Sequence, residues 1–120
     1  MQTKQIGLIT RQWQLYPNAH RNRTNLIVHM FAVPLFLAGT VGLPLALFVS
    51  SWLAPAGIAS MAVALGLQGR AHGREQNRPP PFRGTWDMLA RILLEQWITF
   101  PRFVLTGGFK HAWHGQDSGA

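Results

Sequence analysis

The chain has 120 residues, enough for one domain and too few for two independent cores. Its 11 Lys and Arg against 4 Asp and Glu give a net charge of +7, and the absence of cysteine excludes disulfides and thiolate metal ligands. Any transition-metal site must therefore use imidazole, carboxylate, amide or water. The sequence contains no groove-reading nucleic-acid motif, so anionic lipid headgroups are the partner that this charge favours.

The first predicted element is a short amphipathic helix over residues 1–15. Its Trp13 and the following Tyr16 are residue types that concentrate at membrane interfaces. Pro17 cannot continue the hydrogen bonding of the preceding helix, so we expect the chain to break there.

A stretch without formal charge then extends from Met30 to Gly69. About 40 helical residues would reach roughly 60 Å, twice the thickness of a bilayer core. We predict an apolar membrane hairpin over residues 24–71, with its turn at residues 52–57 and its return arm at residues 58–67. Because this arm is short, a re-entrant loop is the alternative to two full crossings.

Basic residues flank the apolar stretch on both sides, whereas its turn has none. Lys and Arg concentrate on the cytoplasmic side of membrane proteins. The pattern therefore predicts a multi-pass protein of a bacterial-type inner (cytoplasmic) membrane, with both termini in the cytoplasm.

The remainder begins with a basic connector containing Pro79, Pro80 and Pro81, a run that favours extended polyproline geometry. Residues 85–109 are predicted to form amphipathic or partly inserted helices, because a full span would place Arg91 and Glu95 in lipid. Pro101 is expected to end the first of these helices. Residues 116–120 are predicted to be a flexible tail. The predicted fold is thus one all-α domain over residues 1–120, a helical integral membrane protein.

Two polar clusters lie at the two ends of the apolar stretch. Asn25 and His29 are four residues apart and share a helix face, and His72 and Glu75, three apart, do the same. A hairpin brings both clusters to one membrane face, where His20 can fold back from the polar segment after Pro17. Imidazole and carboxylate ligands without sulfur suit iron(II), manganese or zinc.

This arrangement predicts a metal site made of His20, His29 and His72, with Glu75 as a further ligand or as the partner that orients a ring. The residues expected to support the ligands are Asn25, Gln68 and Tyr16. The alternative is a helix end in the headgroup zone, whose histidines and ion pairs bind no metal. We interpret His111 and His114 as interfacial histidines.

The order of these residues resembles a known family, the small membrane proteins related to the fungal 2-hydroxy fatty acid dioxygenase. The resemblance covers roughly residues 16–103 and is carried by Tyr16, His20, Asn25, His29 and Pro34, then Gln68, His72, Glu75, Pro79 and Pro80. The gap between His72 and Glu75 is one residue shorter than in the family pattern, which bears on the role of Glu75 more than on the histidines.

The resemblance implies an iron(II)-dependent dioxygenase that shortens long-chain 2-hydroxy fatty acids by one carbon (α-oxidation) at the membrane surface. Dioxygen and the fatty acid would be its substrates, and zinc or manganese stay open as metals. Its expected iron ligands and catalytic residues are His20, His29 and His72. Four nearby arginines could attract the substrate carboxylate or, equally, lipid headgroups: Arg21, Arg23, Arg70 and Arg74.

Two other functions stay open. One is a non-catalytic membrane scaffold or partner-binding protein, as a monomer or a homo-oligomer. The other is a different metal-dependent lipid enzyme, such as a hydroxylase or hydrolase. The three histidines are too few and too dispersed for the histidine boxes of a di-iron lipid hydroxylase.

Overall fold

The computed structural model describes residues 7–115, and the regular elements in this range are all helical, which confirms the all-α prediction. In chain order they are α1 (Leu8–Ala19), α2 (Arg23–Leu45), α3 (Leu53–His72), α4 (Thr85–Leu94), the π-helix η1 (Glu95–Thr99), α5 (Phe100–Leu105) and α6 (Gly108–Gly115). The predicted tail at residues 116–120 and the first six residues of the predicted N-terminal helix lie outside the described residues.

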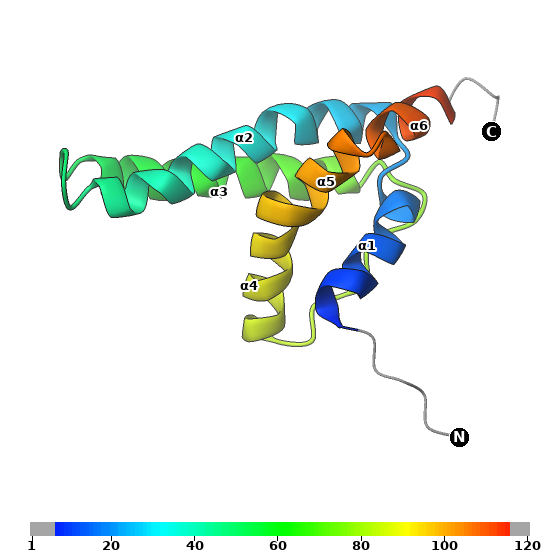
Figure 1. Ribbon diagram of the computed structural model, residues 1–120, viewed down its shortest axis with the longest axis horizontal. Coiled ribbons are helices and arrows are strands. Elements are labelled where there is room, and N and C mark those ends of the chain that lie inside the picture. The colour runs from blue at the N-terminus through cyan, green and yellow to red at the C-terminus, as the bar shows by residue number, and fades with distance from the viewer. Residues whose placement is uncertain (1–6, 116–120) are drawn as a thin grey trace.

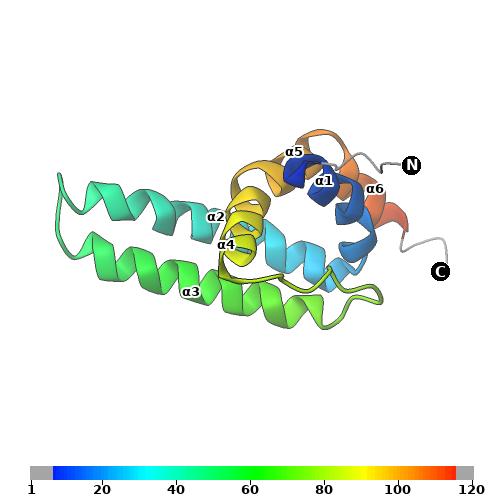
Figure 2. The same cartoon turned by 90° about the horizontal axis from the view of Figure 1, so that it is seen from below.

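The two longest helices, α2 and α3, lie side by side as an antiparallel hairpin (Figures 1 and 2). Their backbones approach most closely at Gly39 and Gly57, where a Cβ added to either glycine would lie 2.6 Å from the carbonyl oxygen of the other. The sequence places Gly57 in the turn, but α3 already begins at Leu53. Pro55 lies in the first turn of that helix, where a missing N–H breaks no helical hydrogen bond.

Two further prolines lie within helical structure where the sequence predicts breaks. Pro17 is inside α1, which continues for two more residues to Ala19. Pro101 is at the start of α5, directly after η1. In a regular α-helix its ring would clash with the carbonyl of Trp97, four residues earlier, and the wider π-turn gives it room. The chain therefore runs helically from Thr85 to Leu105.

Helices α1, α4, α5 and α6 and η1 pack over one half of the hairpin, which we call the bundle end (Figure 1). The larger apolar core there contains Tyr16, Leu26, Val33, Phe100 and Phe103. A smaller one joins Ala32, Phe36 and Ala64 to Ile92 of α4. The other half, residues 38–60, extends past these cores and is called the hairpin tip.

The hairpin tip is apolar on its outside. Leu47 and Phe48 at the connection between α2 and α3 are each 82% exposed, and Trp52 and Ile58 are also exposed. Among the described residues, α2 is the one helix that is both long and apolar enough to cross a bilayer. The prediction of a multi-pass topology is therefore not supported, because α3 does not meet the same criterion.

Candidate metal centre

Three histidines from three different elements meet at the bundle end. His20 follows the last residue of α1, His29 lies in the second turn of α2, and His72 is the last residue of α3. Their ring centroids are 4.7–4.9 Å apart, and the ring planes are nearly perpendicular to one another, at 84–88°. The antiparallel hairpin brings His29 and His72 together, and the short link after α1 adds His20.

Glu95 is the fourth member of the group. Its Oε2 lies 3.2 Å from Nε2 of His20 and 3.3 Å from Nε2 of His29. Together, Glu95 and the three histidines offer one ligand atom each within 4.8 Å of one another. This group could hold a metal ion, and we call it the His–Glu cluster.

Backbone carbonyls orient two of the rings. Nδ1 of His20 is 2.8 Å from the carbonyl oxygen of Tyr16, and Nδ1 of His29 is 2.9 Å from that of Asn25. A carbonyl only accepts hydrogen bonds, so each Nδ1 carries a proton and donates. In the neutral rings each Nε2 then presents a lone pair to the centre of the cluster, as in metal-binding histidines whose other nitrogen is held by an outer partner.

The electrostatics of the cluster fit a cation. Nε2 of His29 and Nδ1 of His72 are buried and have no hydrogen-bond partner within residues 7–115. Leaving such a group unsatisfied costs about 1–3 kcal/mol. Burial, together with the electrostatic effect of the neighbouring His20 and His29, lowers the pKa of His72 to about 4, against the opposing effect of Glu95. His72 is therefore neutral at pH 7 and can offer a lone pair to a metal ion.

Glu95 is ionised and has a second partner. Burial alone would raise the pKa of Glu95, but the neighbouring imidazoles of His20 and His29 hold it well below its usual range. The Tyr16 hydroxyl donates to Glu95 Oε2 at 2.9 Å, and the Tyr16 ring stacks on His20 with 3.6 Å between centroids. Burial and the neighbouring carboxylate raise the pKa of Tyr16 well above its usual value, so this hydroxyl keeps its proton.

Glu75, the carboxylate expected from the sequence, lies outside the His–Glu cluster. Its oxygens accept hydrogen bonds from the backbone N–H groups of Arg21 and Asn22 at 2.9–3.1 Å and from Asn25 Nδ2 at 2.7 Å. These bonds fasten the link between α1 and α2, next to His20. Glu75 and Asn25 therefore position this link and the N-terminus of α2, where a negative charge is also favoured.

Gln68 connects α3 to the element that carries Glu95. Its side-chain amide exchanges two hydrogen bonds with that of Gln96, at 2.9 and 2.8 Å, and both residues are buried. The sequence did not predict Glu95 or Gln96 as residues of the site. The one available signal was the spacing of Asp87, Arg91 and Glu95 at intervals of four, which is equally typical of a solvated helix face.

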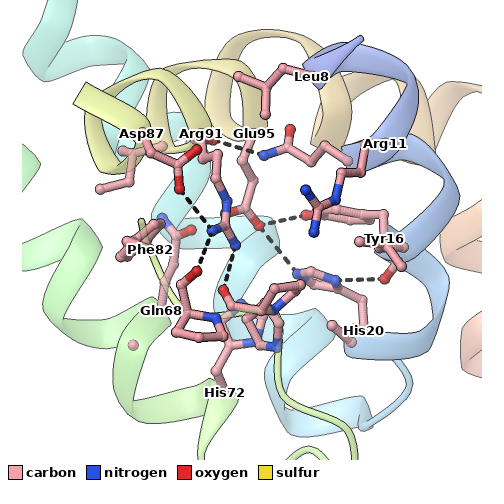
Figure 3. Close-up of a pocket in the computed structure, with 18 of the residues that line it drawn as sticks. Leu8, Arg11, Tyr16, His20, Gln68, His72, Phe82, Asp87, Arg91 and Glu95 are labelled. Carbon is pink, nitrogen blue, oxygen red and sulfur yellow. Dashed lines mark hydrogen bonds and ion pairs between the residues drawn. The ribbon is translucent and has the colours of Figure 1, made fainter. Parts of the chain in front are cut away.

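A cavity of about 570 Å³ opens beside the cluster (Figure 3). His20, His72 and Glu95 line it at one side, and its apolar walls include Leu8, Leu15, Leu65 and Ile92. The arginines that line it are Arg11, Arg83 and Arg91. The four suggested by the sequence, Arg21, Arg23, Arg70 and Arg74, do not. Arg23 instead donates to the carbonyl of Trp113 and stacks over its ring.

Fold and site together define a small all-helical protein with a buried three-histidine, one-glutamate cluster beside an apolar cavity. The family model described as 2-hydroxy-palmitic acid dioxygenase Mpo1-like matches residues 7–104, a range that contains all four cluster residues. The chain belongs to this family. His111 and His114, on α6, lie beyond the match. The comparisons with curated proteins and with solved structures give no match.

Proposed function

We propose that the protein is an iron(II)-dependent dioxygenase that acts on long-chain 2-hydroxy fatty acids at a membrane surface. The observation that carries this proposal is the convergence of the His–Glu cluster at the wall of a largely apolar cavity. Family membership supports the dioxygenase chemistry and the 2-hydroxy fatty acid as substrate. Imidazole and carboxylate ligands with no sulfur suit iron(II), although manganese and zinc accept the same donors.

The chain's own residues have separate tasks in this proposal. His20, His29, His72 and Glu95 would hold the ion, which when bound would supply the coordination positions and the redox chemistry for dioxygen. The Tyr16 and Asn25 carbonyls keep the His20 and His29 rings in one tautomer and orientation. The Tyr16 hydroxyl holds a proton 2.9 Å from Glu95 Oε2, and the apolar walls of the cavity accept the acyl chain.

The hairpin tip supports a membrane location. From residue 38 to residue 49 it extends roughly 18 Å, deeper than one leaflet but too short to cross a core of about 30 Å. A re-entrant tip of this depth keeps the bundle end, with its cluster and cavity, at a single membrane face. A fatty acid could then enter the cavity from the bilayer.

Helix α4 fits the same placement. It lies roughly perpendicular to the hairpin, so an inserted tip would leave it parallel to the membrane plane (Figure 1). Trp86, Leu89 and Leu93 follow one another at helical spacing, and all three are exposed, Trp86 at 84%. An amphipathic helix with such a face binds in the headgroup zone of a bilayer.

Metal content and oxygen uptake test the proposal. We expect anaerobically purified protein to contain about one iron per chain and to consume oxygen with 2-hydroxyhexadecanoic acid. His29→Ala and His72→Ala should lose the metal and at least about a hundredfold in rate, whereas His111→Ala should behave as wild type. Wild-type protein without bound metal, or unchanged turnover in both variants, would contradict it. No metal and no oxygen uptake would favour a non-catalytic scaffold.

A further inference from the structure

The cavity beside the cluster holds several cationic side chains, and Arg91 is already occupied. Its guanidinium donates to the carbonyls of Pro81 and Pro80 at 3.0 and 2.6 Å and pairs with Asp87 at 3.3 Å. It also stacks over the ring of Phe82, 4.6 Å from the centroid. Arg91 therefore fastens the polyproline connector over α4 and has little capacity left for a ligand. In Figure 3 these dashed interactions converge on Arg91.

Arg83 is exposed and close to the same carboxylate. Its backbone N–H donates to Asp87 Oδ2 at 2.9 Å, and its positive charge contributes to the lowered pKa of Asp87. Arg83 and Arg91 together offset the single negative charge of Asp87. The other carboxylate at the cavity, Glu95, is engaged by the histidines and Tyr16.

Arg11 is different. Its side chain is half-buried in the cavity wall, and within residues 7–115 its guanidinium has no hydrogen-bond or ion-pair partner. It lies on the face of α1 that lines the cavity, and Figure 3 shows it on the same side as Tyr16 and His20. A half-buried guanidinium facing an apolar cavity gains most from an anionic ligand with two oxygens.

The neighbouring residue holds this part of α1 in place. Gln12 Nε2 donates to the backbone carbonyl of Arg91 at 2.9 Å, and Gln12 Oε1 accepts a hydrogen bond from Thr99. These bonds tie α1 to α4 and η1, the elements that carry the opposite cavity wall and Glu95. The Arg11 side chain therefore starts from a fixed backbone, which lowers the entropic cost of binding an anion.

We propose that Arg11 binds the carboxylate of an amphiphilic acid whose acyl chain lies along the apolar walls formed by Leu15, Leu65 and Ile92. This assignment rests on the proposed function for the identity of the acid, a 2-hydroxy fatty acid, and it makes Arg11 the residue that selects a carboxylate over a neutral headgroup. It replaces the arginines near the histidines in sequence, none of which lines the cavity.

Binding without turnover provides the test. Under anaerobic conditions, the affinity of the metal-loaded protein for 2-hydroxyhexadecanoic acid and for the neutral 1,2-hexadecanediol can be measured by tryptophan fluorescence. We expect Arg11→Gln to weaken binding of the acid by about tenfold to a hundredfold and to leave the diol unchanged. Arg11→Lys should retain part of the preference, because it keeps the charge but loses the fork of donors. Arg78→Gln removes the same charge from an exposed position outside the cavity and should bind as wild type.

The two proposals fail in different ways. If wild type consumes oxygen with the acid but Arg11→Gln leaves its KM unchanged, the Arg11 assignment is wrong and the enzyme activity stands. If wild type prefers the acid to the diol through Arg11 but never consumes oxygen, the activity is wrong and the carboxylate site stands. Equal binding of hexadecyl phosphate, also lost in Arg11→Gln, would overturn the carboxylate preference in favour of a general anionic headgroup site.

Discussion

The two ends of the α2–α3 hairpin differ in the side chains that they bury and expose. At the tip the helices meet through Gly39 and Gly57 and expose Leu47 and Phe48. At the bundle end the same helices enclose polar side chains, and other helices cover their apolar faces. The tip therefore presents apolar side chains to its surroundings, whereas the bundle end gathers ligand atoms that could hold a cation. A single hairpin thus combines a candidate metal centre at one end with an exposed apolar surface at the other.

The largest effect of a substitution is expected for membrane binding by the exposed side chains of the tip. Replacing both Leu47 and Phe48 by serine should weaken binding to anionic phospholipid vesicles by roughly a hundredfold. Burying such side chains contributes about 1.5–3 kcal/mol each when burial is complete, and 1.4 kcal/mol corresponds to tenfold. Vesicle co-sedimentation measures the change. Leu105→Ser is the matched control, because Leu105 is 86% exposed but lies on α5. Equal losses in both proteins would show that the tip is not the inserting part.

Substitutions of two carboxylates, Glu95 and Glu75, test which of them binds the metal at the bundle end. Glu95→Gln should reduce iron(II) affinity about tenfold to a hundredfold, measured by anaerobic competition with a chelator. Glu75→Gln removes the same charge from a residue that holds backbone N–H groups, so it should lower the free energy of unfolding by about 1–3 kcal/mol with little change in iron affinity. The reverse pattern would make Glu75 the metal ligand, as the sequence suggested.

The smallest effect is expected for stability, from substitutions at the close contact between α2 and α3. A Cβ on Gly39 would lie 2.6 Å from the carbonyl oxygen of Gly57, so Gly39→Ala must separate the backbones and should cost about 1–3 kcal/mol of stability. Gly66, on the same hairpin, has open space around it, and Gly66→Ala should stabilise α3 by up to about 1 kcal/mol. Thermal unfolding in mild detergent compares the two. A gain in stability for Gly39→Ala would contradict the close approach.

Local sequence patterns predicted some residues of the site better than others. Histidines 29 and 72 could be placed near each other because an antiparallel hairpin leaves only one pairing for its two open ends. Pro17 and Pro101 misled the prediction of helix ends, because α1 keeps its last turn and η1 widens to admit the proline ring. Arg11 stood nine residues before His20, with no pattern that distinguished it from the other arginines.

The sequence by itself determined the helical class, the apolar hairpin and the histidines at its open ends, since hydrophobic length and the distribution of charge are local properties of the chain. Only the tertiary structure decided which carboxylate joins them. Glu75 is close to His72 in sequence, yet backbone N–H groups of the α1–α2 link engage it. Glu95 reaches the histidines because Gln68, Gln96 and the core around Phe100 dock η1 against the hairpin. Such long-range contacts depend on how amphipathic faces pack. The spacing of residues within one segment therefore cannot predict that Glu95, and not Glu75, lies beside the histidines.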